Sequence, residues 1–238
     1  MNIFNLFKKD SQLLKSHSGT QTEEDYYKNL FIENELWNKP DPNNEERLRW
    51  EIIEKFLLFV KAKSFEDEEN HLSILDLGCG RGWLTNLLSG YGTVKGIEPV
   101  QPVVQHANKI FPSLDITQGT SKNLLESGYN KKFDLIVSSE VIEHVPDNMK
   151  EEFVTDIKKL LKENGFAIIT TPRKDAQTEW QKYLNPEQPI EDWMSEGELE
   201  SLFAKVGFEK QLLERYSISP QQGAPMIEIY QLWLFKCV

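Results

Sequence analysis

The sequence predicts one α/β domain: a three-layer sandwich around a seven-stranded, mostly parallel sheet whose last strand is antiparallel. From residue 73 onward, short apolar runs alternate with amphipathic stretches. Continuous apolar runs are typical of parallel strands that helices cover on both faces. The chain has 238 residues, which is enough for one such domain with a full core and short for two.

The apolar runs place the individual elements. Strands are expected at 74–77, 94–97, 114–117, 133–137, 167–171, 209–218 and 227–235. Helices are expected at 45–61, 83–88, 102–110, 122–126, 148–162 and 196–205. Asn44 is the candidate cap of the first helix, and Gly165 is the expected stop of the fifth. Gly223 and Pro225 separate the last two runs and predict an antiparallel pair.

The N-terminal part differs from the rest in composition. Residues 1–44 are expected to form a tail and a cap segment, and 45–238 the main domain, in which 173–194 is an insertion over the site. The polar stretch 11–21 is expected to be a flexible lead-in. The first residues place apolar side chains before Lys8 and Lys9, the reverse of a secretory signal. This order favours a cytoplasmic protein, with an interfacial membrane anchor as the alternative.

Composition excludes several classes of function. The net charge is −11, and nucleic-acid affinity comes largely from Lys and Arg, so a nucleic-acid partner is not expected. Cys79 and Cys237 stand far apart with no C-x-x-C pair, which indicates neither a disulfide framework nor a zinc site. No apolar run is long enough to span a bilayer. A small, uncharged or cationic acceptor molecule is the expected partner.

The most informative segment is the turn after the first strand, where glycines stand at positions 78, 80 and 82. Positions without side chains let a ligand approach the backbone, and the start of the following helix offers unpaired N–H donors. Glu98 lies at the end of the next predicted strand, where a carboxylate can accept both hydroxyls of a ribose. Together these features predict a nucleoside-containing cofactor. A purely structural turn is the alternative.

The glycine spacing distinguishes between two such cofactors. The dinucleotide pattern is G-x-G-x-x-G, whereas the spacing here is G-x-G-x-G, with Asp76 two residues before the first glycine. An acidic side chain repels a pyrophosphate and suits the cationic ammonium and sulfonium groups of S-adenosylmethionine. The comparison favours S-adenosylmethionine, and an NAD-dependent oxidoreductase is the alternative.

Several segments resemble one known family. Residues 75–82 (LDLGCGRG) and 94–98 (VKGIE) resemble the first two motifs of the class I S-adenosylmethionine-dependent methyltransferases. Residues 133–147 (FDLIVSSEVIEHVPD) are similar to the fourth-strand motif of the type 11 and ubiquinone-pathway O-methyltransferase branch. Residues 165–172 and 196–208 resemble the following strand and the late helix of that branch. The resemblance extends from about Arg47 to the C-terminus.

The resemblance implies a Rossmann-like fold and a reaction. The implied reaction transfers a methyl group from S-adenosyl-L-methionine to an oxygen or nitrogen of a small molecule such as a sugar, phenol or quinone precursor, leaving S-adenosyl-L-homocysteine. No Asn-Pro-Pro-Tyr or Asp-Pro-Pro-Tyr follows the fourth strand, which disfavours nucleobase or glutamine amide methylation. A catalytically silent relative that binds the cofactor as a scaffold is a further alternative.

The resemblance also implies roles for single residues. Asp76, Gly78 and Gly80 are expected at the methionine end of the cofactor, together with Cys79 as a small packing side chain within the loop. Glu98 is expected to hold the ribose.

The remaining cofactor residues come from other segments. Thr120 and Ser121 stand beside the expected adenine, where Thr120 replaces the family's usual acid and Ser121 offers its backbone N–H. Ser139 ends the fourth strand near the methyl group. Arg47 resembles an arginine that meets the methionine carboxylate, with a solvated helix face as the alternative.

The E-x-x-E-H sequence of Glu140, Glu143 and His144 has three interpretations. His144 can accept a proton from a substrate hydroxyl, since an imidazole titrates near neutral pH. The three side chains can also hold a divalent metal, as in the similar motif of small-RNA 3′-end methyltransferases. The metal is not favoured, because those enzymes use a further histidine that has no counterpart in a following motif here. The third interpretation is that the residues orient the turn.

Aromatic residues gather in the two segments that are expected to cover the site. A lid of aromatic side chains would align the reactants and exclude water. Ordinary packing is the alternative for each of them. The residues are Tyr26, Tyr27, Trp37, Trp180, Tyr183 and Trp193.

Overall fold

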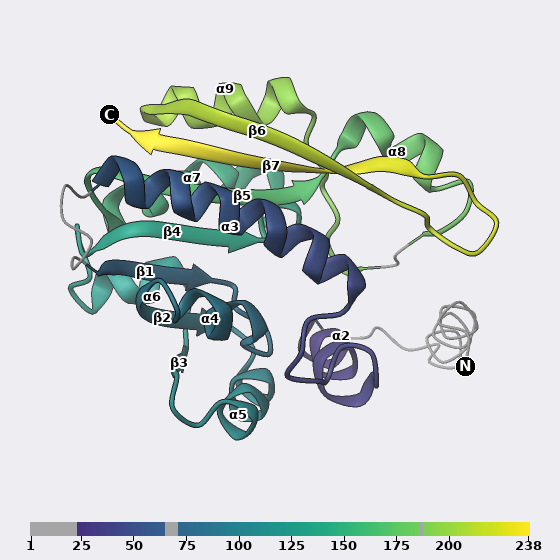
Figure 1. Ribbon diagram of the computed structural model, residues 1–238, viewed down its shortest axis with the longest axis horizontal. Helices are drawn as coiled ribbons and strands as arrows, with labels where there is room; N and C mark the ends of the chain where they lie inside the picture. Colours follow the sequence, from purple (N-terminus) through teal and green to yellow (C-terminus); the bar gives the residue numbers. More distant parts are fainter. Residues whose placement is uncertain (1–22, 65–70, 186–187) are drawn as a thin grey trace.

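The computed structural model describes residues 23–64, 71–185 and 188–238. These residues form a seven-stranded sheet with the strand order β3-β2-β1-β4-β5-β7-β6 (Figure 1). The strands are β1 (Leu72–Leu77), β2 (Gly92–Glu98), β3 (Asp115–Gln118), β4 (Phe133–Ser139), β5 (Leu161–Pro172), β6 (Phe208–Ile218) and β7 (Ile227–Cys237). Strand β7 is antiparallel to β5 and β6, and the other pairs are parallel. The predicted α/β sandwich is confirmed.

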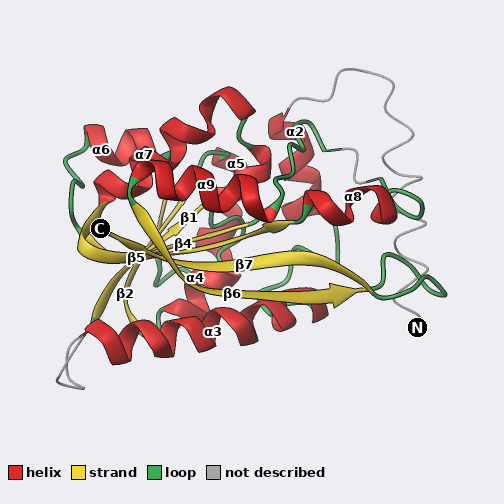
Figure 2. Cartoon of the chain, turned by 90° about the horizontal axis from the view of Figure 1, so that it is seen from above, coloured by secondary structure: helices red, strands yellow, loops and turns green. Residues whose placement is uncertain are grey.

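Helices cover both faces of this sheet. They are α2 (Glu23–Lys28), the π-helical turn η1 (Asn29–Glu33), α3 (Asn44–Ser64), α4 (Trp83–Leu88), α5 (Gln101–Ile110), α6 (Ser121–Glu126), α7 (Lys150–Leu160), α8 (Lys174–Trp180) and α9 (Glu196–Val206). Figure 2 shows α3 along one face and α6, α7 and α9 on the other. Within the described ranges, none of the helices is both long and apolar enough to cross a bilayer.

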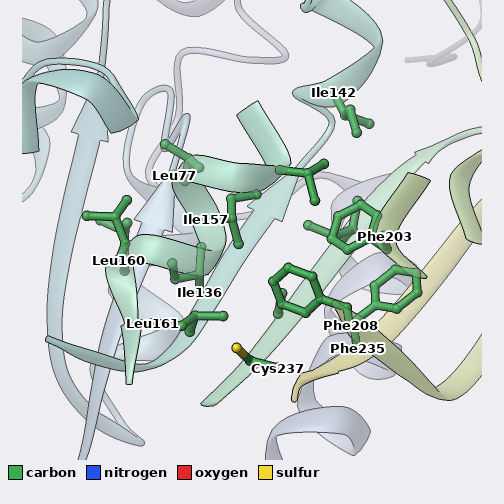
Figure 3. Packing of buried hydrophobic residues seen from close by; sticks show 14 of the residues in the cluster. Leu77, Ile136, Ile142, Ile157, Leu160, Leu161, Phe203, Phe208, Phe235 and Cys237 are labelled. Carbon is green, nitrogen blue, oxygen red and sulfur yellow. The ribbon is translucent and has the colours of Figure 1, made fainter. Parts of the chain in front are cut away.

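Two hydrophobic clusters hold the layers together. On one face, α7 and α9 pack on β4, β5 and β7 through residues such as Ile157, Phe203 and Phe235 (Figure 3). On the other face, α3 and α4 pack on the same sheet through residues such as Phe56 and Leu84. Alternate residues of one strand serve opposite clusters, as expected for a strand that is buried on both sides.

Several element boundaries differ from the sequence predictions, and two of the differences have a clear physical reason. The side chain that caps α3 is Asn43, not Asn44: Asn43 Oδ1 accepts the Glu46 N–H at 2.9 Å. The fifth predicted helix, α7, ends at Leu160 and not at Gly165, because Leu161 already pairs with Phe133 of β4. The register then shifts, so 162–165 forms a bulge within β5.

The expectations for residues 1–22, including the polar lead-in and the alternative of a membrane anchor, lie outside the described residues.

The parallel arrangement brings the carboxyl ends of β1, β2, β4 and β5 to one edge of the sheet. Because Pro172 pairs with Tyr230, the start of β7 lies at that edge as well. Ligands of open α/β sheets bind at this edge.

Candidate functional site

The glycine loop after β1 is shaped by positive φ angles. They are +79° at Gly78, +51° at Gly80 and +86° at Gly82, values that glycine adopts without a steric penalty. The N–H groups of Gly78 and Cys79 both donate to the Ile97 carbonyl at 2.9 Å. A Cβ atom on Gly78 would lie 2.4 Å from Val141 Cγ2. The loop is therefore packed directly against the turn that follows β4.

Glu98 stands at the end of β2 beside this loop. Its Oε2 accepts the Gly80 N–H at 3.1 Å, and its Oε1 accepts the Val100 N–H at 3.0 Å. The carboxylate is buried and fixed in direction by these two bonds. Glu98 is therefore a buried carboxylate whose orientation is set by the main chain on either side of it.

Two buried side chains lie behind the loop. Asp76 accepts a hydrogen bond from Thr85 Oγ1 at 2.6 Å, and burial raises the pKa of its carboxyl to about 7. Cys79 packs against Val104 and Ala107 of α5, and burial raises the pKa of its thiol well above the ordinary value. A buried thiol of this kind is unreactive. Cys79 therefore shapes the loop as a packing side chain.

The residues expected near the adenine and the methyl group have defined partners. Thr120 caps α6 and exchanges hydrogen bonds with Asn123 in a capping box. The Ser121 hydroxyl donates to Asp156 Oδ2 at 3.0 Å, and Ser139 Oγ lies 3.0 Å from Thr170 Oγ1. The side chains of Thr120 and Ser121 thus support α6, while Ser139 is linked to β5.

The two arginines near the start of α3 have different environments. Arg47 is exposed, and its Nε donates to the Pro42 carbonyl at 3.1 Å. Arg49 is buried. Its Nη2 lies 3.0 Å from Glu45 Oε1 and 3.6 Å from Glu140 Oε2. The structure thus places Arg47 on the solvent side of the helix and Arg49 in the site.

Sequence reasoning missed the cluster around Arg49. The Arg49 Nε donates to the Tyr216 hydroxyl at 3.2 Å, and the guanidinium lies over the Tyr230 ring at 5.1 Å. A signal was present: Arg49 precedes the buried residues Ile53 and Phe56 at helical spacing. A cation on the apolar face of a helix indicates a buried partner.

The two glutamates of the E-x-x-E-H turn point to different threonines of β5. Glu140 has a φ of +57°, and its Oε1 accepts the Thr170 hydroxyl at 2.7 Å. Glu143 Oε2 accepts the Thr171 hydroxyl at 3.0 Å. Burial raises the carboxyl pKa to about 8 at Glu140 and about 7 at Glu143. Within the described residues, no three His, Cys, Asp or Glu side chains are grouped so as to hold a metal ion.

His144 is oriented by main chain from the 173–194 insertion. Its Nδ1 lies 2.8 Å from the Ile190 carbonyl oxygen. A carbonyl can only accept, so Nδ1 carries the hydrogen and the lone pair of the neutral imidazole is on Nε2. Nε2 lies 3.9 Å from Glu143 Oε1. The ring meets the Tyr27 ring edge-on, with the centroids 5.9 Å apart.

Residues 24–43, which we call the cap, cover the glycine loop. Tyr27 stacks on Phe31 with the ring centroids 6.2 Å apart. A Cβ atom on Gly80 would lie 3.0 Å from Phe31 Cζ. The cap therefore contacts the glycine loop through Phe31 and His144 through Tyr27. Figure 1 shows α2 below the end of α3.

The aromatics of the insertion pack elsewhere. Trp180 and Trp193 are buried in a separate cluster with Ile227 and Ile229. The last residues of the insertion are hydrogen-bonded to the E-x-x-E-H turn, since the Asp192 N–H donates to the Glu143 carbonyl at 2.8 Å. The two tryptophans thus serve packing, while the insertion contributes main-chain groups to the site.

Comparisons with known proteins show which family the chain belongs to and which proteins it is similar to. A family model described as a methyltransferase domain matches residues 44–213. The chain is 28% identical to the ubiquinone biosynthesis O-methyltransferase of Pelagibacter ubique over 191 residues, covering 67% of this chain and 77% of that protein. It is 35% identical to the mitochondrial ubiquinone biosynthesis O-methyltransferase of Rattus norvegicus, covering 49% of this chain and 37% of that protein. The chain thus spans well under half of the rat protein.

Solved structures agree on the fold. A protein from Pyrococcus horikoshii superposes with a TM-score of 0.66 at 18% identity, covering 90% of this chain and 99% of that one. A SAM-dependent methyltransferase from Methanosarcina mazei superposes with a TM-score of 0.60 at 17% identity, covering 71% and 94%.

Proposed function

Because the chain belongs to the methyltransferase domain family and is an S-adenosylmethionine-dependent methyltransferase, we propose that it methylates a hydroxyl oxygen of a small molecule. The acceptor class that we propose is a phenol or quinone precursor, with a sugar hydroxyl as the second choice. Relatives that are named ubiquinone biosynthesis O-methyltransferases support the first class.

The glycine loop after β1 and Glu98 at the end of β2, which we call the cofactor half of the site, fit S-adenosylmethionine. This cofactor supplies an electrophilic methyl carbon when bound. Glu98 presents a buried carboxylate beside the glycine loop as the group that binds the ribose hydroxyls, and the side-chain-free Gly78 and Gly80 let the methionine end approach the backbone. Asp76 lies behind the loop as a carboxyl that a nearby cation would ionise. We assign Arg47 to the methionine carboxylate, as the family resemblance implies, because its guanidinium is exposed on α3 and accessible to a ligand.

The observation that carries the choice of base is the orientation of His144. The Ile190 carbonyl holds the hydrogen on Nδ1 and leaves Nε2 with the lone pair that accepts a hydroxyl proton. Proton transfer creates an imidazolium, which the nearby Glu143 carboxyl stabilises when ionised. Methyl transfer needs alignment of the nucleophile and exclusion of water, and the cap residue Tyr27 shields the imidazole.

A cytoplasmic location is part of the proposal. Both cysteines, Cys79 and Cys237, are buried free thiols, the form that a reducing compartment maintains. Fractionation of cells that produce the native protein tests this location. Recovery in a membrane or secreted fraction would contradict it.

The decisive experiment measures S-adenosylhomocysteine formation with a panel of phenols, sugars and amines. We expect turnover with one or more phenols, and a rate lowered about 10²–10⁴-fold in His144→Gln, the usual contribution of a general base. Calorimetric binding of S-adenosylhomocysteine should be unchanged in this variant. Equal rates in wild type and variant would refute His144 as the base, and turnover only with amines would refute the acceptor class.

Two controls accompany this assay. Glu98→Ala should weaken S-adenosylhomocysteine binding at least tenfold, because the ribose loses its acceptors and Gly80 loses its partner. Adding and chelating magnesium tests the metal interpretation of the E-x-x-E-H turn. Binding without turnover on any acceptor would favour the scaffold alternative.

A further inference from the structure

One residue of the glycine loop is not explained by cofactor binding. Arg81 lies between Gly80 and Gly82, yet its side chain is fully buried, with 0% exposed. Its Nη1 and Nη2 donate to Glu46 Oε1 and Oε2 at 2.6 and 2.7 Å. Such a bidentate pair fixes direction as well as distance. Arg81 therefore points away from the cofactor and toward the start of α3.

The remaining contacts of Arg81 are with the main chain of the cap. Its Nε donates to the Lys39 carbonyl at 2.7 Å, and its Nη2 reaches the Asp41 carbonyl at 3.4 Å. Glu46 extends the same network, since its Oε2 accepts the Asn43 N–H at 2.8 Å. The guanidinium thus holds the C-terminal part of the cap at Lys39 and Asp41, and its partner Glu46 holds it at Asn43.

The N-terminal part of the cap returns to the same loop. Phe31 lies against Gly80, the residue directly before Arg81. On the other side, His106 Nε2 of α5 lies 3.3 Å from the Asn38 carbonyl oxygen. The cap therefore contacts the glycine loop in two places, through the Phe31 ring at Gly80 and through the buried guanidinium of Arg81.

We propose that Arg81 is a positioning residue that couples the cap to the glycine loop and so retains the bound cofactor. Removing water from a guanidinium and a carboxylate is costly, and the cost is offset only when every donor finds a partner. Here the partners belong to the cap and to the first turn of α3. A cap that separates from the loop would remove the Lys39 and Asp41 carbonyls from the buried Nε and Nη2 of Arg81, while Glu46 would still hold the guanidinium in place, so these two bonds favour the closed arrangement. The inference rests on the use of S-adenosylmethionine and is independent of the acceptor.

The test is Arg81→Lys, which keeps the charge and removes the two parallel bonds and the Nε contact. Hydrogen exchange of the apoenzyme should show at least tenfold faster exchange of the amides in 24–43, with no change in β1 or β4. Dissociation of S-adenosylhomocysteine, followed by stopped flow, should also be at least tenfold faster. In turnover, the KM for S-adenosylmethionine should rise at least tenfold while kcat changes less than threefold.

A matched control separates coupling from general stability. Lys158 is also a cation that donates to main-chain oxygens, those of Val206, Gly207 and Val238, but it lies near the start of β6, away from the glycine loop. Lys158→Met should lower the thermal midpoint and leave cofactor dissociation unchanged. Glu46→Gln provides a second variant of the pair if Arg81→Lys does not fold, and it should show the same pattern as Arg81→Lys.

Two results would overturn the inference. Faster cofactor dissociation with unchanged exchange in the cap would mean that Arg81 acts within the loop alone. Faster exchange in the cap with unchanged dissociation would mean that the pair is only structural. Neither readout involves an acceptor, so a wrong acceptor class would leave both intact.

Discussion

The two halves of the candidate site owe their geometry to different chemical groups. In the cofactor half, around β1 and β2, the geometry comes from main-chain groups: positive φ angles at glycines, and the N–H groups that fix Glu98. In the half around β4, β5 and β7, where we propose that the acceptor binds and which we call the acceptor half, the geometry comes from buried ionisable side chains that distant segments bring together, with Arg49 and Glu140 at their centre.

Because of this difference, the two halves should tolerate different amino-acid substitutions. A backbone-built site fails when an atom is added, because the neighbouring backbone cannot move away without losing its hydrogen bonds. A site built from side-chain charges fails when a partner is removed, because the remaining charge is left buried. The following predictions test this contrast, in order of decreasing effect.

The largest effect is expected from Gly78→Ala. The new Cβ would lie 2.4 Å from Val141 Cγ2, and the residue would keep a φ of +79°. Strain and overpacking together should cost about 4 kcal/mol, measured as a loss of S-adenosylhomocysteine affinity and of stability. The double variant Gly78→Ala, Val141→Ala should regain the packing part only. Full recovery would show that the backbone conformation does not matter.

In the acceptor half, Arg49→Met should have the next largest effect. Removing one partner of a buried pair costs about 3–5 kcal/mol, and we expect the lower end because Glu140, with a pKa of about 8, can become neutral. Chemical denaturation measures the change. Arg47→Met, two residues away and exposed, is the matched control and should change stability by less than about 0.5 kcal/mol. Similar losses of stability in both variants would contradict the interpretation that burial of Arg49 causes the effect.

A smaller effect is expected from pH on the cofactor half. Burial raises the pKa of Asp76 from 3.8 to about 7, and the ammonium group of S-adenosylhomocysteine attracts the ionised form. Affinity for S-adenosylhomocysteine should therefore rise by up to about tenfold in total between pH 6 and pH 8, and most of the rise should occur below pH 7, where Asp76 ionises.

The sign for folding is opposite. A raised carboxyl pKa means that the folded state binds the extra proton, so the contribution of Asp76 to stability falls as pH rises from about 4 to 7. Asp76→Asn should remove both pH dependences. Calorimetry and thermal melts at several pH values measure them, and an unchanged affinity profile in the variant would assign the dependence to another group.

The smallest effect is expected at the two helix caps. Thr120 and Ser195 form capping boxes at the starts of α6 and α9. Replacing either by alanine should cost about 1 kcal/mol of stability. Only Thr120→Ala should also weaken cofactor binding, by about two- to threefold, because α6 borders the cofactor half. Equal affinities in the two variants would remove α6 from that half.

The same contrast explains what the sequence could predict. Except for β5, which begins at Leu161 and not at residue 167, the strands were predicted to within a few residues, because buried parallel strands are continuous apolar runs. The glycine loop and Glu98 were found because a short local pattern determines their geometry. One helix end was misplaced because Leu161 continues the apolar periodicity of α7 while it already pairs with β4.

The contacts that the sequence did not reveal join distant segments. Arg81 and Glu46 are 35 positions apart, and Arg49 and Tyr216 are 167 positions apart. No local period or motif spacing connects such partners. They follow from the folded topology, which places the start of α3 beside both the glycine loop and β7.

That topology also dictates an order of assembly during synthesis. Strand β7 lies between β5 and β6, although β6 is made first. Until residues 227–237 have left the ribosome, β6 has no partner and β5 presents an open row of N–H and C=O groups. The growing chain therefore exposes an unpaired sheet edge, which favours aggregation, until β7 is inserted. A pause in translation within β7 would prolong that state, and a chaperone that covers β5 would protect it.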